Sequence, residues 1–297
     1  MRKIKIGYFA DGPWGHYAFE LLNNDERFEI GFICVRYDSE DEVFIKLAND
    51  NNIDLIKHRD VNSDEFLNEI HKYLCDIFVS MSFNQILRTK FINFTPLKTI
   101  NCHAGKLPFY RGRNILNWVL INDEKEFGIT VHYIDEGIDT GDIILQQVYP
   151  ISDEDDYNTI LNRAYIECSI VLHKALILIY EGNVKPIKQE NIHPIGHYCI
   201  QRKNGDEKID WNNKSREIFN FVRSICKPGP IARTQLGEYE LKINRVSLIN
   251  SSPTYKLICG AIVGITEGKP IVKTRDSTIC IEEYESERKL RIGDRLK

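Results

Sequence analysis

Residues 3–35, KIKIGYFADGPWGHYAFELLNNDERFEIGFICV, are the stretch that decides the fold class. Residues 3–10 begin by alternating basic and apolar side chains, which is typical of a strand, and the pattern ends at residues 11–13 in a tight Asp-Gly-Pro loop. A helix over residues 14–22 and a second, buried strand over residues 28–35 are expected to follow. This order of strand, loop, helix and strand indicates an α/β fold.

The alternation of strands and helices continues along the first half of the chain. The further elements expected there are a helix over 43–51, a strand over 53–56, a helical face formed by Phe66, Ile70 and Leu74, and strands over 76–80 and 98–102. Strands that alternate with helices at this spacing imply a Rossmann-like, mostly parallel sheet with helices on both faces.

The character of the sequence changes after about residue 197. The elements expected before this point are a helix over 114–120, strands over 129–134 and 143–148, and a long helix over 156–180. The elements expected after it are a helix near 216–226 and short strands over 240–249, 257–264, 270–274 and 278–283. Because 297 residues exceed a typical single domain, we expect a catalytic domain over 1–200 and a smaller, β-rich domain over 201–297.

The charge balance argues against several kinds of partner. The chain has 39 Lys and Arg against 43 Asp and Glu, a net charge of −4, so no global basic field attracts a nucleic acid. No apolar segment is long enough to cross a bilayer, and the N-terminus lacks a signal-peptide pattern, so we expect a cytoplasmic protein without a membrane partner. The eight scattered cysteines favour free thiols, and Pro194 and Gly196 between His193 and His197 argue against a metal site.

Polar residues gather at the end of the strand expected over 98–102. Asn101 and His103 lie at i and i+2, so both side chains are expected on one face, and ligands of open α/β sheets lie beyond the carboxyl ends of the strands. The later stretch DEGIDTGD at 135–142 is a poor strand and a poor helix, which predicts a tight connection. Taken singly, Asn101 could cap a turn, His103 could be a satisfied loop histidine, and Asp139 could stabilise an Asx turn.

Together these motifs resemble the formyltransferase family that uses N10-formyltetrahydrofolate. The resemblance covers most of the first 200 residues, with matching separations between Asn-x-His at 101–103, LPFYRG at 107–112, GIT at 128–130 and DEGIDTGD at 135–142. It implies that Asn101, His103 and Asp139 occupy the three catalytic positions and that the formyl donor is N10-formyltetrahydrofolate.

The chemistry of formyl transfer suits these three side chains. Attack of an amine on the formyl carbon creates a tetrahedral oxyanion, to which the amide of Asn101 can donate a hydrogen bond. The amine must lose a proton, which His103 can accept near neutral pH. Asp139 would orient the imidazole, stabilise its protonated form and could relay a proton to the departing folate nitrogen. This chemistry requires no metal.

The resemblance also implies a folate site. In the family, the segment that corresponds to SFNQIL at 82–87 cradles the pterin, and the loop over 135–142 helps to hold it. The side chains expected near folate are therefore Phe83, Ile86 and Leu87 from the first segment and Asp135, Ile138 and Asp142 from the second. Core packing of the apolar side chains and solvent exposure of the acidic ones are the competing explanations.

The family divides by the amine that receives the formyl group: initiator methionyl-tRNA, glycinamide ribonucleotide, or a nucleotide-linked amino sugar. RGRNILNW at 111–118 resembles the sugar N-formyltransferases, whereas the glycinamide enzymes are much shorter. The tRNA enzymes resemble one another in a basic insertion where this chain has the acidic run DSEDE at 38–42, which has the wrong sign for tRNA phosphates. These features favour a sugar enzyme.

Several cationic and aromatic residues are expected to contact the nucleotide-linked sugar, either beyond the first strand or near the inferred domain junction. They are Trp14, Arg113, Tyr198, Arg202 and Arg223, with Lys203 and Lys227 beside them. Packing of the helix equally explains Trp14, and a solvated surface or hinge equally explains the others.

Commonness within the family favours thymidine diphosphate-linked 4-amino-4,6-dideoxyglucose as the sugar, in O-antigen or lipopolysaccharide synthesis. Two alternatives stay open: methionyl-tRNA formyltransferase, and a non-catalytic sensor of folate or nucleotide. Exposed C-terminal strands leave a homodimer open as well.

Overall fold

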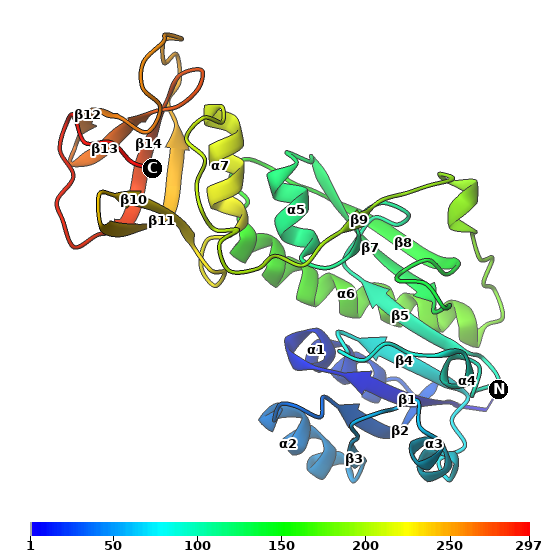
Figure 1. Ribbon diagram of the computed structural model, residues 1–297. Coiled ribbons are helices and arrows are strands. Elements are labelled where there is room, and N and C mark those ends of the chain that lie inside the picture. Colours follow the sequence, from blue (N-terminus) through cyan, green and yellow to red (C-terminus); the bar gives the residue numbers. More distant parts are fainter. Residues whose placement is uncertain (1) are drawn as a thin grey trace. The chain divides into compact units, whose positions relative to one another are not determined.

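A computed structural model describes residues 2–297 of the chain, which divides into two compact units (Figure 1). The first unit consists of Met1–Gly112, Phe127–Tyr149 and Asn162–Cys199, and the second of Arg113–Glu126, Pro150–Leu161 and Ile200–Lys297. The second unit thus takes in two segments that precede residue 200. The domain boundary placed at that residue stays a prediction.

The first unit is built on a seven-stranded sheet with the strand order β3-β2-β1-β4-β5-β7-β8. Its strands are β1 (Ile4–Ala10), β2 (Phe28–Val35), β3 (Asp54–Lys57), β4 (Ile77–Met81), β5 (Thr99–His103), β7 (Glu126–Tyr133) and β8 (Ile143–Pro150). The β1–β2, β1–β4, β2–β3 and β4–β5 pairs are parallel, and β5 and β7 are antiparallel. The expected α/β fold with a mostly parallel sheet is therefore confirmed.

Helices and short elements lie between these strands in the sequence or follow the last of them. They are α1 (Gly12–Asn23), α2 (Glu42–Asn51), α3 (Asp64–His71), α4 (Thr89–Ile92), α6 (Tyr157–Tyr180), the 3-10 helix η1 (Gln189–Asn191), and the two-residue strands β6 (Arg111–Gly112) and β9 (Tyr198–Cys199), which pair with each other. Of the residues that the structure describes, none forms a helix long and apolar enough to cross a membrane.

Neighbouring residues of β1 supply the cores on both faces of the sheet. Phe9 is fully buried against Phe66 of α3 and Phe91 of α4, with ring centroids 6.2 and 4.9 Å away. Tyr8 meets Phe44 of α2 at 6.1 Å. Because successive side chains of a strand point to opposite faces, α3 and α4 cover one face of the sheet and α2 covers the other.

The second unit packs helices beside a five-stranded antiparallel sheet with the order β10-β11-β14-β13-β12. Its elements are α5 (Ile115–Ile121), α7 (Ser215–Ser224), β10 (Ala232–Leu236), β11 (Tyr239–Leu248), β12 (Ile262–Thr266), β13 (Lys269–Lys273) and β14 (Thr278–Glu285). Ile218 and Val222 of α7 are buried in one core with Trp211 and the inward side chains of the sheet. The expected smaller, β-rich part of the chain is confirmed.

Two local expectations were wrong, and one strand was missed. Leu74 lies beyond the end of α3, with a positive φ of 50° and an exposed fraction of 71%, because the chain leaves the helix before it to enter β4. The strand expected over 257–264 begins only at Ile262. The strand β10 was not expected, because its alternation of buried Ala232, Thr234 and Leu236 with polar residues is short and only partly apolar.

Replacing Gly7 by alanine tests the packing of the first unit. A Cβ at Gly7 would lie 2.6 Å from Cδ1 of Phe78 and 2.8 Å from Cζ of Phe32, so the methyl group forces two buried rings apart. We expect Gly7→Ala to lower the free energy of unfolding by about 1–3 kcal/mol, measured from urea midpoints at unchanged m-value. Gly31→Ala is the matched control, since the nearest atom there is Cε of the flexible Lys5 side chain. Equal losses in the two variants would contradict this account.

Candidate active site

The register between β5 and β7 in the first unit brings the residues of the candidate site together. In this antiparallel pair, Asn101 lies opposite His132, and His103 lies opposite Thr130. Directly opposite residues of an antiparallel pair share a face of the sheet, and so do residues two apart on one strand. Four polar side chains therefore lie together at the carboxyl end of β5.

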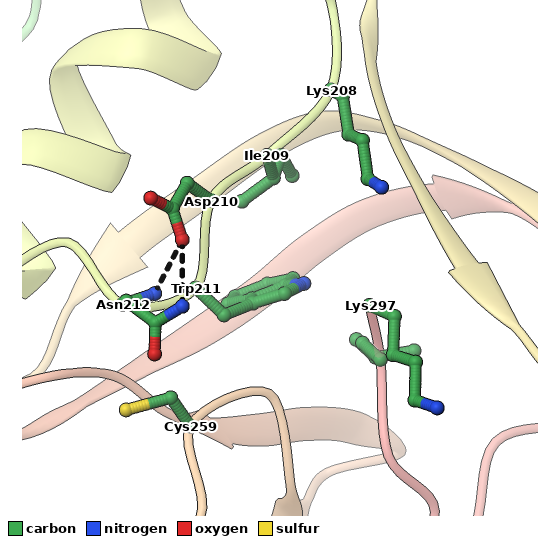
Figure 2. A pocket seen from close by; sticks show the side chains of 8 residues that line it. Lys208, Ile209, Asp210, Trp211, Asn212, Cys259 and Lys297 are labelled. Carbon is green, nitrogen blue, oxygen red and sulfur yellow. Dashed lines mark hydrogen bonds between the residues drawn. The ribbon is translucent and has the colours of Figure 1, made fainter.

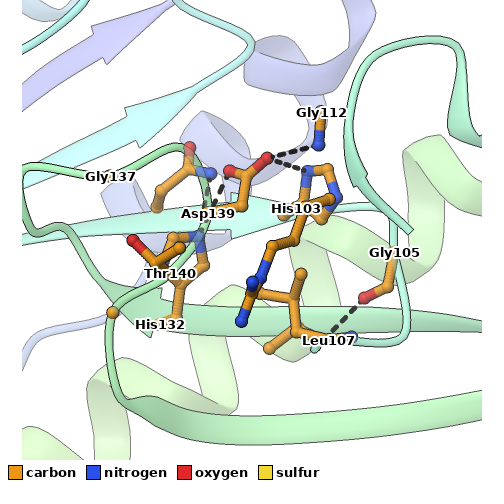
Figure 3. Close-up of polar contacts among 12 residues, drawn as sticks. His103, Gly105, Leu107, Gly112, His132, Gly137, Asp139 and Thr140 are labelled. Atoms are coloured by element: carbon orange, nitrogen blue, oxygen red, sulfur yellow. Dashed lines mark hydrogen bonds and ion pairs between the residues drawn. The ribbon is translucent and has the colours of Figure 1, made fainter. Parts of the chain in front are cut away.

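The imidazole of His103 is held by a backbone carbonyl. Its Nε2 lies 2.7 Å from the carbonyl oxygen of Tyr110, and because a carbonyl only accepts hydrogen bonds, we assign a hydrogen to Nε2. Nδ1 then faces Oδ2 of Asp139 at 3.6 Å (Figure 3). Gly105 makes this arrangement possible, since a Cβ there would lie 2.5 Å from Nε2 of His103 and 2.4 Å from the Tyr110 oxygen.

Asp139 is a buried carboxylate that lies between two imidazoles and accepts a backbone hydrogen bond. Its Oδ2 accepts a hydrogen bond from the backbone N–H of Gly112 at 2.8 Å, and its Oδ1 lies 3.6 Å from Nε2 of His132. Burial by itself raises the pKa of Asp139, but the charge of His103, the hydrogen bond and charge of His132, and the Gly112 N–H together bring that pKa far below its usual value. The carboxylate is therefore ionised at any pH at which the protein would work.

His132 fixes the orientation of the Asn101 amide. Nδ1 of His132 lies 2.7 Å from the carbonyl oxygen of Tyr133, to which it donates a hydrogen bond. Nε2 of His132 lies 3.3 Å from Nδ2 of Asn101 and 3.6 Å from Oδ1 of Asp139, so it accepts from Asn101 in the neutral ring and donates towards Asp139 in the protonated ring. With the neutral ring, one hydrogen of the Asn101 amide is directed at His132, and the other can donate to a developing oxyanion.

Sequence reasoning missed His132, although a signal for it exists. Its alternation with Thr130 along a strand was visible, but only the register between β5 and β7 brings it beside Asn101. The expected meeting of Asn101, His103 and Asp139 occurs in the structure, whereas their catalytic roles stay predictions. Within residues 2–297, no group of three His, Cys, Asp or Glu side chains is arranged to hold a metal ion.

The residues expected near folate lie in two places. Asp135 and Asp142 line a pocket of about 380 Å³ with residues of α4 and the end of β7, and Oδ1 of Asp135 accepts hydrogen bonds from Thr140 and the backbone of Gly137. Ile138, on the same loop, is 57% exposed.

The segment after β4 does not line this pocket. Leu87 is buried in the core of the first unit, and Phe83 is half-buried and packs against this core, with 5.6 Å between its ring centroid and that of Phe9. Ile86 is 75% exposed and is the most accessible of these three residues. Their contact with folate stays a prediction.

The residues expected to contact a nucleotide-linked sugar are divided between the units. In the first unit, Trp14 packs edge-on against Tyr165 at 4.6 Å, and the Tyr198 ring lies 5.3 Å from the guanidinium of Arg111. Both aromatic side chains therefore have partners within the first unit. For Trp14, this is the packing role that the sequence left open.

In the second unit, the segments that carry Arg113 and Arg202 are joined by hydrogen bonds, and Arg113 donates to Oε1 of Gln201 at 3.4 Å. The backbone N–H of Arg202 donates to the side chain of Asn114 at 2.9 Å, and its guanidinium lies 5.6 Å from the Trp118 ring. Arg223 is different, because its guanidinium is 6% exposed and donates to the carbonyl oxygens of Ser152 and Asp155. Arg113 and Arg202 are therefore better placed than Arg223 to meet an anionic ligand, and all three roles stay predictions.

A pocket of about 430 Å³ within the second unit has a different character (Figure 2). Oδ1 of Asp210 accepts hydrogen bonds from the backbone and side chain of Asn212, both at 2.9 Å. The indole N–H of Trp211 donates to Thr234. These polar groups are therefore engaged in local hydrogen bonds of the second unit.

An amide, an imidazole and an ionised carboxylate lie together in the first unit, which is a set of side chains suited to acyl transfer, and the chain belongs to the formyl transferase family. Residues 32–189 match the family model described as formyl transferase, and residues 202–294 match the formyl transferase C-terminal domain. The chain is therefore a formyltransferase, as its motifs indicated.

Relatives of this chain carry two different names. A methionyl-tRNA formyltransferase from Fusobacterium nucleatum subsp. nucleatum is 33% identical over 80% of this chain and 76% of its own length. Among solved structures, WlaRD, a sugar 3N-formyl transferase in the presence of dTDP and 5-N-formyl-THF, matches with a TM-score of 0.72 and 25% identity over 98% of this chain and 100% of its own. The N-formyltransferase from Helicobacter canadensis, in complex with folinic acid and dTDP-3-aminofucose, shares the fold at a TM-score of 0.70 and 23% identity over 95% of this chain and 100% of its own.

Asp139→Asn tests the electrostatics of the site through the pH dependence of stability. Because the pKa of Asp139 is lowered in the folded protein, its stabilising contribution is complete above the ordinary carboxyl pKa of about 3.9 and is lost as the pH falls below it. We expect the difference in unfolding free energy between wild type and variant to be largest at about pH 5–7 and to shrink towards about pH 2.

The control for this measurement is Asp142→Asn, which removes the same charge from the same loop away from the two histidines. Urea unfolding at a series of pH values gives the comparison. A wild-type advantage over Asp139→Asn that stays constant down to low pH would show that the carboxylate is not stabilised as described.

Proposed function

We propose that this formyltransferase is a sugar N-formyltransferase, which transfers a formyl group from N10-formyltetrahydrofolate to the amino group of a nucleotide-linked amino-deoxy sugar. The observation that carries the sugar class is the match with WlaRD, which extends along the whole of that chain. The match with the Fusobacterium methionyl-tRNA formyltransferase covers 76% of that protein, so about a quarter of its length has no counterpart in the matched part of this chain.

The arrangement of the site supports a direct transfer. The amine attacks the formyl carbon, and the oxyanion that forms accepts a hydrogen bond from Nδ2 of Asn101. Nδ1 of His103 takes the proton that the amine loses, and the proton then lies between the ring and the Asp139 carboxylate 3.6 Å away. Collapse of the intermediate breaks the bond to N10 of the folate, and this nitrogen receives a proton as tetrahydrofolate leaves.

The second candidate is methionyl-tRNA formyltransferase, which the 33% identity with the Fusobacterium enzyme favours. The acidic run at 38–42 counts less against it than the sequence indicated. Asp41 accepts hydrogen bonds from His16 and from the N–H groups of Gly12 and Phe44, and Asp38 pairs with Arg36. Asp38 is therefore paired with a cation and Asp41 is engaged by hydrogen bonds within the fold, which leaves Glu40 and Glu42 as the exposed charges of the run.

A panel of acceptors separates the two candidates. The protein with N10-formyltetrahydrofolate should release tetrahydrofolate with at least one thymidine diphosphate-linked 3-amino- or 4-amino-dideoxy sugar, including 4-amino-4,6-dideoxyglucose. The product should gain the mass of one formyl group in place of a hydrogen. Initiator methionyl-tRNA in the same panel should be neither formylated nor retained at low salt. Formylation of the tRNA alone would overturn the sugar proposal.

His103→Asn separates an enzyme from a sensor. An amide cannot accept the proton of the amine, so we expect turnover to fall by about 10²–10⁴-fold while calorimetry shows unchanged binding of the folate. His71→Asn, at an exposed position at the end of α3, is the control and should keep wild-type turnover. A wild-type protein that binds folate but formylates no acceptor of the panel would favour the sensor.

A further inference from the structure

Gln189 is a buried polar residue outside the three expected catalytic positions. It begins η1, and its exposed fraction is 3%. Two backbone hydrogen bonds between Ile143 and Ile187, of 2.8 and 2.9 Å, fasten the segment before η1 to the first residue of β8. This attachment brings the Gln189 side chain beside the loop at 135–142.

The Gln189 amide holds the backbone of that loop. Nε2 donates one hydrogen bond to the carbonyl oxygen of Asp139 and one to that of Gly141, each of 2.8 Å. Asp139 itself has a positive φ of 55°, a conformation that costs free energy for a residue with a side chain and persists only where its surroundings fix it. The two hydrogen bonds from Gln189 fix the backbone of this loop on both sides of Thr140.

Arg111 determines which way the Gln189 amide points. Its Nε and Nη2 lie 3.0 and 2.7 Å from Oε1 of Gln189. Because a guanidinium only donates hydrogen bonds, Oε1 must face Arg111 and Nε2 must face the loop. Both hydrogens of the amide and both lone pairs of its oxygen are thus in use, so a single orientation satisfies every group.

The same short strand holds the side chain of Asp139 as well. Arg111 and Gly112 form β6, and the Gly112 N–H donates to Oδ2 of Asp139. Asp139 is therefore held at its carboxylate by Gly112 directly and at its carbonyl by Arg111 through Gln189. Both attachments start from neighbouring residues, which keeps the carboxylate at a fixed distance from His103.

We propose that Gln189 is a positioning residue for formyl transfer, which holds the Asp139 loop so that the carboxylate faces Nδ1 of His103. The inference rests on the proposed function, in which this imidazole accepts the proton of the amine. A displacement of reacting groups by about 1 Å can lower a reaction rate by about 10²-fold. Loss of the hydrogen bonds from Gln189 to the loop should therefore slow the chemical step.

Two variants remove the hold in different ways. Gln189→Met keeps the length of the side chain and loses all four hydrogen bonds. Gln189→Glu keeps the acceptors for Arg111 but turns oxygen lone pairs towards the carbonyl oxygens of Asp139 and Gly141. Glu190→Gln is the matched control, since it changes an exposed neighbour in the same turn, whose carboxylate lies 3.6 Å from Nζ of Lys188.

Kinetics and a substrate-free titration read out the effect. With N10-formyltetrahydrofolate and the acceptor that the panel identifies, we expect both Gln189 variants to lower kcat by about 10- to 100-fold with KM for either substrate unchanged. In ¹³C-labelled protein without substrate, the Asp139 carboxyl carbon should titrate at higher pH in both variants than in wild type, because its donors are no longer held in place. Glu190→Gln should match wild type in both measurements.

The outcomes separate this inference from the proposed function. If the wild type formylates no acceptor, the proposed function fails, and the Asp139 titration still decides whether Gln189 holds the loop. Unchanged kcat in the variants of an active enzyme would overturn the inference, as would an unchanged Asp139 titration. If Gln189→Met does not fold by circular dichroism, Gln189→Glu gives the same comparison, because it keeps the pairing with Arg111.

Discussion

The burial of one ionised carboxylate is the constraint on which the site depends. Moving a carboxylate from water into the protein interior costs roughly several kcal/mol unless nearby charges and hydrogen bonds replace its hydration. Asp139 is compensated by two imidazoles and one backbone N–H, and each of these must be brought from a different part of the chain. The close approaches at Gly105 and the pairing of β6 with β9 both serve that convergence.

The part of the fold that local patterns control could be predicted from the sequence. The alternation of strands and helices predicted the parallel sheet, and the spacing of Asn101 and His103 predicted a shared face because that relation lies within one strand. His132 and Gln189 escaped prediction for a physical reason. His132 reaches the site only through the register between β5 and β7, which pairs it with Asn101, 31 residues earlier, and Gln189 only through the attachment of the segment before η1 to β8. No local pattern encodes either relation.

The reaction and the acceptor are encoded at different places in the chain. In the proposed function the reaction belongs to a few buried groups in the first unit, which are constrained by the need to satisfy every donor and acceptor. The more exposed Arg113 and Arg202, which are proposed to recognise the acceptor, face fewer constraints. Proteins that share the fold carry names for sugar and for tRNA substrates, as expected where the function lies in a few side chains and not in the fold.

The pairing of Asn101 with His132 across two strands links chemistry to correct strand alignment. A slip of β7 against β5 by one residue would turn Thr130 and His132 to the opposite face of the sheet together with every apolar neighbour on the strand. Such a misaligned molecule would lose its core packing and its active site in the same event. The specific activity of a preparation of this enzyme should therefore be proportional to the fraction of molecules in which β5 and β7 are paired in the native register.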